Sequence, residues 1–140
     1  TELRAKHPDR LFFGSGDIWT AEDVFAMLDV TGVTGVSVAR GCIGNPWIFR
    51  QCRQMMAGRA PSEPTLAEQR DVLLEHLRLS TELHGERGAS KMMRKFGIRF
   101  AKHHPEGHQV KADFIACDSR AAWHRVLEVH YPTDQCTIPT

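Results

Sequence analysis

The chain has 140 residues, of which 41% are hydrophobic and 25% charged, and its 18 lysines and arginines nearly balance 17 aspartates and glutamates. This composition is that of an ordinary globular protein and excludes a disordered chain or a strongly basic tail. No apolar run approaches the roughly 18–20 residues that cross a bilayer, so we expect a soluble, cytoplasmic protein with no membrane segment. The length suits about one domain and is too short for a complete (β/α)8 barrel, which takes about 250 residues.

The four cysteines, Cys42, Cys52, Cys117 and Cys136, are scattered without a C-x-x-C pair. We therefore expect reduced thiols with mostly structural roles and no metal site. The chain starts with Thr1 in the middle of a polar pattern, which suggests a piece of a longer protein, although processing of an initiator methionine also exposes such a residue.

The first part of the chain has the pattern of a strand, a helix and a second strand. Apolar or β-branched runs at 11–13 and 33–38 predict two short buried strands. Between them Thr20 and Asp23 predict a helix start, and Gly32 predicts its end. The two strands of such a βαβ unit are expected to be parallel.

The second part is predicted to be helical throughout. After a helix at 47–56, residues 58–64 are rich in glycine and proline, and we place a domain boundary between 60 and 61. Further helices are predicted from Thr65 to near Gly85 and at 87–103, 108–117 and 119–131, which together form a small four-helix bundle. The first of these has a Thr65–Glu68 capping box and carries apolar residues toward a core: Val72, Leu73, Leu77 and Leu83.

Two glycine-bearing turns follow the predicted strands, at 14–17 and 38–41. Glycines let backbone N–H groups approach a ligand closely, and Arg40 adds a cation, so together the turns suit a phosphate. In (β/α)8 barrels a phosphate site often lies after the last two strands, beside a short extra helix, here expected at 41–44. The alternative is that both are merely tight turns.

Six cations of the predicted helix at 87–103 lie within an arc of about 140° on a helical wheel, and we call them the basic stripe. They are Arg87, Lys91, Arg94, Lys95, Arg99 and Lys102. Residues 87–111 contain seven lysines and arginines but one acid, Glu106, which is typical of a surface that binds RNA or DNA phosphates. Nearby histidines at 103, 104 and 108 favour extra phosphate contacts over metal binding. The alternative is an ordinary solvated helix face.

The order of these segments resembles the end of the barrel in bacterial tRNA-dihydrouridine synthases of the nitrogen-regulation-like branch. The resemblance rests on residues 14–18, 31–41 and 44–49, and on 93–96 with the following Phe100. It implies an α/β, mostly helical fold, with the last two βα units of a TIM barrel at 1–60 and a helical tRNA-binding domain at 61–140. It also implies an enzyme that uses FMN and NADPH to reduce tRNA uridines.

The same resemblance implies which residues hold the cofactor. The family's FMN-phosphate turn corresponds to Ser15, Gly16 and Asp17, and its Gly-Arg pair to Ala39 and Arg40. The chain departs from the family at Ser15, at Ala39, where a methyl group replaces glycine, and at Phe96, where the family commonly has histidine. The family's proton-donating cysteine and flavin-ring contacts belong to the earlier part of the barrel, so no catalytic residue is assigned to this chain.

The leading hypothesis is therefore the C-terminal part of a tRNA-dihydrouridine synthase that supplies FMN-phosphate turns and tRNA-docking helices and is inactive alone. One alternative is a standalone helical RNA-binding module. Another is an interaction domain whose open strand edges at 11–13 and 35–38 pair with a second copy to form a homo-oligomer.

Overall fold

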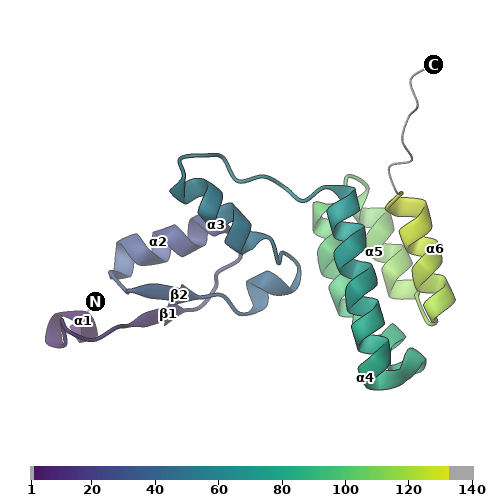
Figure 1. The fold of residues 1–140 in the computed structure, drawn as a ribbon, viewed down its shortest axis with the longest axis horizontal. Helices are drawn as coiled ribbons and strands as arrows, with labels where there is room; N and C mark the ends of the chain where they lie inside the picture. Colours follow the sequence, from purple (N-terminus) through teal and green to yellow (C-terminus); the bar gives the residue numbers. More distant parts are fainter. Residues whose placement is uncertain (1, 133–140) are drawn as a thin grey trace, which may run out of the picture. The chain divides into compact units, whose positions relative to one another are not determined.

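The computed structural model describes residues 2–132 and divides the chain into two compact units, Thr1–Ser62 and Glu63–Thr140 (Figure 1). The structure is mostly helical with two short parallel strands, which confirms the predicted fold class. Within the described residues no helix is long and apolar enough to cross a membrane.

The first unit consists of short elements around a two-stranded sheet. In chain order they are α1 (Glu2–Lys6), β1 (Phe13–Ser15), α2 (Ala21–Thr31), β2 (Gly35–Ser37), the 3-10 helix η1 (Arg40–Ile43) and α3 (Ile48–Met56). β1 and β2 pair in parallel with Ser15 opposite Ser37, so the βαβ prediction is confirmed. Helix α1 was not predicted, and η1 replaces the short helix expected at 41–44.

The prediction that both strands are buried is wrong for this chain. β1 begins two residues later than expected, β2 is shorter than the predicted strand, and Phe13 is 71% exposed. In the part of the chain that the structure describes, the sheet has only these two strands, so no further strand covers their outer edges. Side chains whose pattern suits a buried strand are therefore open to solvent.

Helix α2 begins and ends where its sequence predicts. The Thr20 side chain accepts a hydrogen bond from the Asp23 N–H, while the Asp23 carboxylate accepts one from Thr20 N–H. This capping box satisfies N–H groups that have no partner within the helix. The last turn ends at Gly32, whose φ of 66° lies in the left-handed region that glycine adopts without strain.

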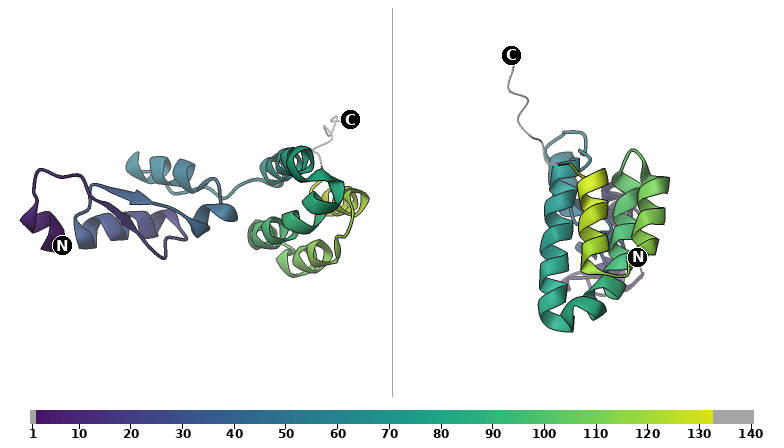
Figure 2. Two further views of the ribbon diagram at one scale, coloured as in Figure 1. Left: turned by 90° about the horizontal axis from the view of Figure 1, so that it is seen from below. Right: turned by 90° about the vertical axis from the view of Figure 1, so that its right-hand side faces the viewer.

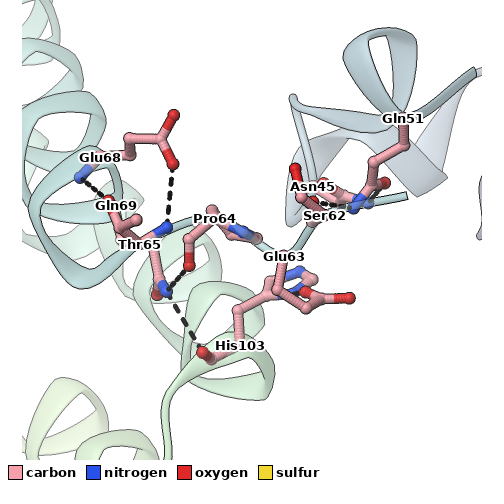
Figure 3. Close-up of polar contacts among 9 residues, drawn as sticks. All are labelled: Asn45, Gln51, Ser62, Glu63, Pro64, Thr65, Glu68, Gln69 and His103. Carbon is pink, nitrogen blue, oxygen red and sulfur yellow. Dashed lines mark hydrogen bonds and ion pairs between the residues drawn. The ribbon is translucent and has the colours of Figure 1, made fainter. Parts of the chain in front are cut away.

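The first unit holds its own end of the predicted linker (Figure 3). The Asn45 side-chain amide donates to Gln51 Oε1 over 2.8 Å, and Gln51 Nε2 donates to the Ser62 carbonyl over 3.2 Å. The Ser62 N–H also donates to Gln54 Oε1 over 2.9 Å. Residues up to Ser62 are thus ordered against α3.

The second unit holds the other end in the same way (Figure 3). Gln69 is fully buried, and its Nε2 donates to the carbonyls of Pro64 and His103 over 3.2 Å each. His103 Nδ1 lies 2.8 Å from Glu63 Oε2. These contacts attach the start of the second unit to its own helices.

The second unit is a bundle of helices that pack side by side (Figure 2). Its elements are α4 (Leu66–Phe100), the 3-10 helix η2 (Ala101–His103), α5 (Gly107–Ala116) and α6 (Arg120–His130). The predicted Thr65–Glu68 capping box is present. Gly85 has a φ of 69° and a ψ of 165°, so it separates α4 into two helical halves, as the predicted break near Gly85 requires.

The bundle core contains large aromatic and aliphatic side chains. Leu73, Phe114, Trp123 and Leu127 are fully buried, and the rings of Phe114 and Trp123 lie 4.7 Å apart. Leu83 was expected in this core but is 78% exposed, because it lies in the last turn before the break at Gly85.

Candidate cofactor and nucleic-acid sites

The turns after β1 and β2 lie next to each other because the two strands pair in parallel. β1 ends at Ser15, and Gly16 and Asp17 then adopt φ values of 130° and 46°. The first value requires glycine, whereas aspartate is one of the few residues that tolerate the second. β2 ends at Ser37, opposite Ser15, so the chain leaves both strands at the same edge of the sheet.

The structure brings all five residues of the predicted cofactor site to one cavity of about 150 Å³. Its lining residues are Ser15, Gly16, Asp17, Ile18, Trp19, Ser37, Ala39, Arg40 and Gly41. We call this the phosphate cavity, after the ligand that the sequence predicts for it. Pockets that enclose a whole small ligand usually exceed roughly 300 Å³, so this cavity has room for only a part of such a ligand.

Close backbone contact fixes the shape of the phosphate cavity. A Cβ atom added at Gly41 would lie 2.0 Å from the carbonyl oxygen of Ile18. Only glycine therefore permits the second turn to pack against the first. The sequence pattern identified Gly41 as part of a turn, but it could not show which backbone atom the glycine meets.

The Arg40 side chain is exposed and makes two contacts in the cavity. One of its guanidinium nitrogens lies 3.6 Å from Asp17 Oδ1, and the guanidinium carbon lies 5.6 Å from the centre of the Trp19 ring. A phosphate bound here would compete with the Asp17 carboxylate for the guanidinium. Trp19 was not among the predicted site residues, although its position two residues after the turn was a signal for it.

Asp23 stabilises the turn from the start of α2. Its Oδ2 accepts hydrogen bonds from the N–H groups of Trp19 and Thr20, both 2.9 Å long. These bonds hold the pKa of the Asp23 carboxyl below its usual value. The carboxylate thus orders the segment between the cavity and the helix.

The structure distributes the basic stripe over several environments. Arg87, Lys91, Lys95 and Lys102 are exposed, whereas Arg94 and Arg99 are half-buried. The Nε of Arg94 donates to the Cys117 carbonyl over 2.6 Å, at the end of α5. The stripe therefore consists of four exposed cations and two half-buried arginines, of which Arg94 is bonded to the end of α5.

The apolar residues opposite the stripe are partly exposed. Met92 is 37% exposed, while Met93 and Phe100 are buried. The Phe96 ring lies 4.2 Å from that of His76 in an edge-to-face arrangement, and Lys95 Nζ lies 5.0 Å from the Phe96 ring centre. Phe96 thus packs between the two halves of α4.

Histidines in the bundle form hydrogen bonds within the protein. His104 Nε2 lies 2.7 Å from the His130 carbonyl, and His130 Nε2 lies 2.7 Å from Asp113 Oδ2. The contact with His130 lowers the pKa of Asp113. Among residues 2–132, no group of three or more metal-ligating side chains is close enough to hold an ion.

The described cysteines are free thiols. Cys42, Cys52 and Cys117 form no disulfide, and burial raises the pKa of Cys117 to about 11. A thiol with that pKa is protonated and unreactive at neutral pH. The prediction for Cys136 concerns a residue outside the described ones.

Comparison with known proteins identifies relatives over most of the chain. The family model for dihydrouridine synthase (Dus) matches residues 1–134. A probable tRNA-dihydrouridine synthase of Mycobacterium leprae is 36% identical over 99 residues, which are 70% of this chain and 26% of that protein. The tRNA-dihydrouridine synthase B of Shewanella oneidensis is 34% identical over 125 residues, which are 84% of this chain and 36% of that protein. The chain spans about a quarter to a third of the length of these relatives.

Proposed function

Because the chain belongs to the dihydrouridine synthase family, we propose that it is the C-terminal part of a tRNA-dihydrouridine synthase of the nitrogen-regulation-like branch. In this proposal the first unit supplies the turns that hold the FMN phosphate, and the second unit docks tRNA. The observation that carries the proposal is the convergence of Ser15, Gly16, Asp17, Ala39 and Arg40 on one cavity.

The phosphate cavity supports the cofactor role through its size and its cation. Arg40 would hold the phosphate, and the backbone around Gly16 would approach it closely. Bound FMN, with NADPH as the reductant, supplies the hydride for uridine reduction. The reaction also needs an acid to protonate the uracil, and no residue here is assigned that role, so we expect the isolated chain to be inactive.

The basic stripe supports the tRNA role. Four of its cations are exposed to solvent. Exposed cations that neutralise RNA phosphates release bound counterions, so the affinity falls steeply as salt is added. The stripe would thereby bring tRNA to the enzyme, in the cytoplasm where we propose that the protein acts.

Titration of fluorescent tRNA with the chain tests this role. We expect the logarithm of the association constant to fall linearly with the logarithm of the salt concentration between about 50 and 200 mM. Lys95→Glu should weaken it, whereas Lys6→Glu, an equal charge change on an exposed residue of the first unit, should change it less. Absence of salt-dependent binding by the unmodified chain would contradict the tRNA role.

A comparison of FMN with riboflavin tests the cofactor role, because the two differ by the phosphate alone. We expect weak binding of FMN, no binding of riboflavin, and loss of FMN binding in Arg40→Gln. Tight binding of both flavins would mean that the chain holds the ring system and that the proposed division of the cofactor site is incorrect.

A homo-oligomer is a second candidate, favoured by the exposure of Leu11 and Phe13 beside the open edges of the sheet. Unpaired strand edges readily pair with another chain. Mass measurement by light scattering would detect it: a concentration-dependent dimer abolished by Phe13→Lys supports strand pairing, and a monomer at all concentrations excludes it.

A further inference from the structure

A groove of about 600 Å³ lies in the second unit between the end of α4, η2 and the start of α5. Besides His104, five cationic or titratable side chains line it. Lys95, Arg99 and Lys102 come from α4 and η2, and His108 and Lys111 come from α5. We call these five residues and the space between them the basic groove.

The lysines of the basic groove have little competition from carboxylates in the part of the chain that the structure describes. Among the described residues, no aspartate or glutamate lines the groove. Within residues 2–132, no ion pair engages Lys95, Lys102 or Lys111. The adjacent Glu106 does not line the groove, and its Oε2 lies 3.8 Å from His130 Nδ1. The groove therefore concentrates positive charge with no carboxylate among its lining residues.

The two walls of the groove are held at a fixed separation. A Cβ at Gly107 would lie 2.3 Å from the Ala101 carbonyl oxygen, and a Cβ at Gly97 would lie 2.5 Å from Phe114 Cγ. These contacts pack the start of α5 directly against η2 and its later part against α4. The backbone positions from which the cations extend are thus fixed relative to one another.

His104 also lines the groove, and hydrogen bonds within the protein engage its ring. Its Nδ1 accepts a hydrogen bond from the Glu106 N–H over 2.9 Å, so its Nε2 carries the proton that is donated to the His130 carbonyl. Both ring nitrogens are engaged within the protein. His104 therefore fixes the chain between η2 and α5 and does not contact a ligand through its nitrogens.

The basic groove differs from the basic stripe in its members. Arg87, Lys91 and Arg94 belong to the stripe but do not line the groove, and Arg94 is bonded to the Cys117 carbonyl. Lys111 lines the groove but lies on a different helix from the stripe. A helical wheel of one helix cannot show this arrangement, because the groove is formed by α4, η2 and α5 together.

We propose that the basic groove, rather than the full stripe, is the site where the second unit binds the sugar-phosphate backbone of RNA, with Lys111 as a contact residue opposite Lys102. The proposal rests on the tRNA-docking function proposed above. The groove has no phenylalanine, tyrosine or tryptophan among its lining residues. Sequence-tolerant recognition of unpaired bases usually uses aromatic stacking, so the groove is suited to phosphates and does not read bases.

The test compares two double variants with the same charge change. Lys102→Gln/Lys111→Gln removes two cations from the groove, and Arg87→Gln/Lys91→Gln removes two from the stripe outside it. All four side chains are exposed, so both variants should keep the fold, which circular dichroism will verify. Binding of two tRNAs of different sequence is measured across a salt series with each protein.

We expect the groove variant to lower the affinity for both tRNAs by roughly tenfold and to reduce the salt slope by about two, one for each lost phosphate contact. The stripe variant should change the affinity and the salt slope by less than half of what the groove variant does. Equal or larger effects of the stripe variant would overturn the proposal, as would a groove effect confined to one tRNA sequence. If the unmodified protein does not bind tRNA at all, it is the tRNA-docking function itself that fails.

Discussion

The two units of this chain differ in how completely they bury their apolar side chains. In the first unit, Ile18, Ala21 and Ile48 form a small buried core, while Leu11 and Phe13 are more than 70% exposed. The second unit contains the remaining thirteen of the sixteen buried hydrophobic residues of the described chain. Burial of apolar surface is the main source of folding free energy, so the second unit should be the more stable part.

The two units also differ in whether their backbone N–H and C=O groups find partners within secondary structure. A two-stranded sheet is at most marginally stable in water, since each strand keeps one unpaired edge. The helices of the second unit satisfy their backbone groups internally and pack around Trp123 and Phe114. The first unit thus exposes apolar side chains and strand edges that are usually covered in a stable domain. The second unit resembles an independent domain.

Separation of the units would give the largest effect. Residues 63–140 expressed alone should retain their helical circular dichroism and unfold cooperatively on heating. Residues 1–62 expressed alone should show little cooperative unfolding because so few apolar side chains are buried. A sharp thermal transition of residues 1–62, at a temperature similar to that of the second unit, would contradict the claim that the first unit is the less stable one.

Three leucines test the difference in burial between the units at single side chains. Leu73→Ala should lower the free energy of unfolding of the bundle by about 3 kcal/mol, because Leu73 is fully buried. Leu83→Ala in the same helix and Leu11→Ala in the first unit remove identical groups from exposed positions and should each cost less than about 0.5 kcal/mol. Urea unfolding measures all three; similar costs for Leu73→Ala and Leu83→Ala would contradict the assigned core.

Asp113 offers a smaller, pH-dependent effect within the second unit. The contact with His130 lowers the folded-state pKa of Asp113 below its ordinary value of 3.8. The stabilising contribution of the Asp113 carboxylate is therefore complete above about pH 3.8, the ordinary pKa, and is lost as the pH falls through the lower folded-state pKa. At pH 6, Asp113→Asn should cost about 1 kcal/mol, since the carboxylate is partly exposed.

Thermal unfolding of both proteins from pH 6 down to pH 3 checks this expectation. The difference in stability between the unmodified protein and Asp113→Asn should shrink as the pH decreases. Gln109→Ala removes the weaker of the two side-chain bonds that lower the pKa of Asp113, so it should give the same pH dependence with a smaller amplitude. A difference that stays constant with pH would exclude the charge of the Asp113 carboxylate as its source.

The smallest expected effect concerns His76 at the contact between the two halves of α4. Burial, with a contribution from nearby Lys95, lowers the pKa of His76 below its ordinary value of 6.5. The neutral form is thus favoured by folding, so stability is complete above pH 6.5 and declines as the pH falls below it. His76→Leu should remove this decline between pH 7 and pH 5 in a thermal series; an unchanged slope would assign the effect to other groups.

The sequence predicted local features well because adjacent residues determine them. Thr20 and Gly32 delimit α2, and Gly85 interrupts α4, through backbone preferences that act within a few residues. The strand positions and the exposure of Phe13 depend on what lies beside the sheet, which periodicity does not report. The same applies to Leu83, whose apolar character predicted burial in a core that its turn does not reach.

In the candidate sites, too, the sequence predicted local turns and missed contacts between elements. Ordered motifs around Gly16 and Arg40 predicted two turns, and parallel strand pairing brings both turns to the phosphate cavity. The basic stripe was found from a wheel of one helix, but the role of Arg94 at the end of α5 depends on a contact across the bundle. Juxtapositions between elements, such as Lys102 with Lys111, follow from packing that the sequence does not encode locally.

Hydrogen exchange of the whole chain, with and without tRNA, tests the central claim that the second unit docks RNA through its basic groove. We predict that tRNA slows exchange most strongly in residues 95–111, with little change in residues 87–91 and in α6, and that the effect decreases as salt is raised. No slowing in residues 95–111, together with protection confined to the first unit, would contradict the claim.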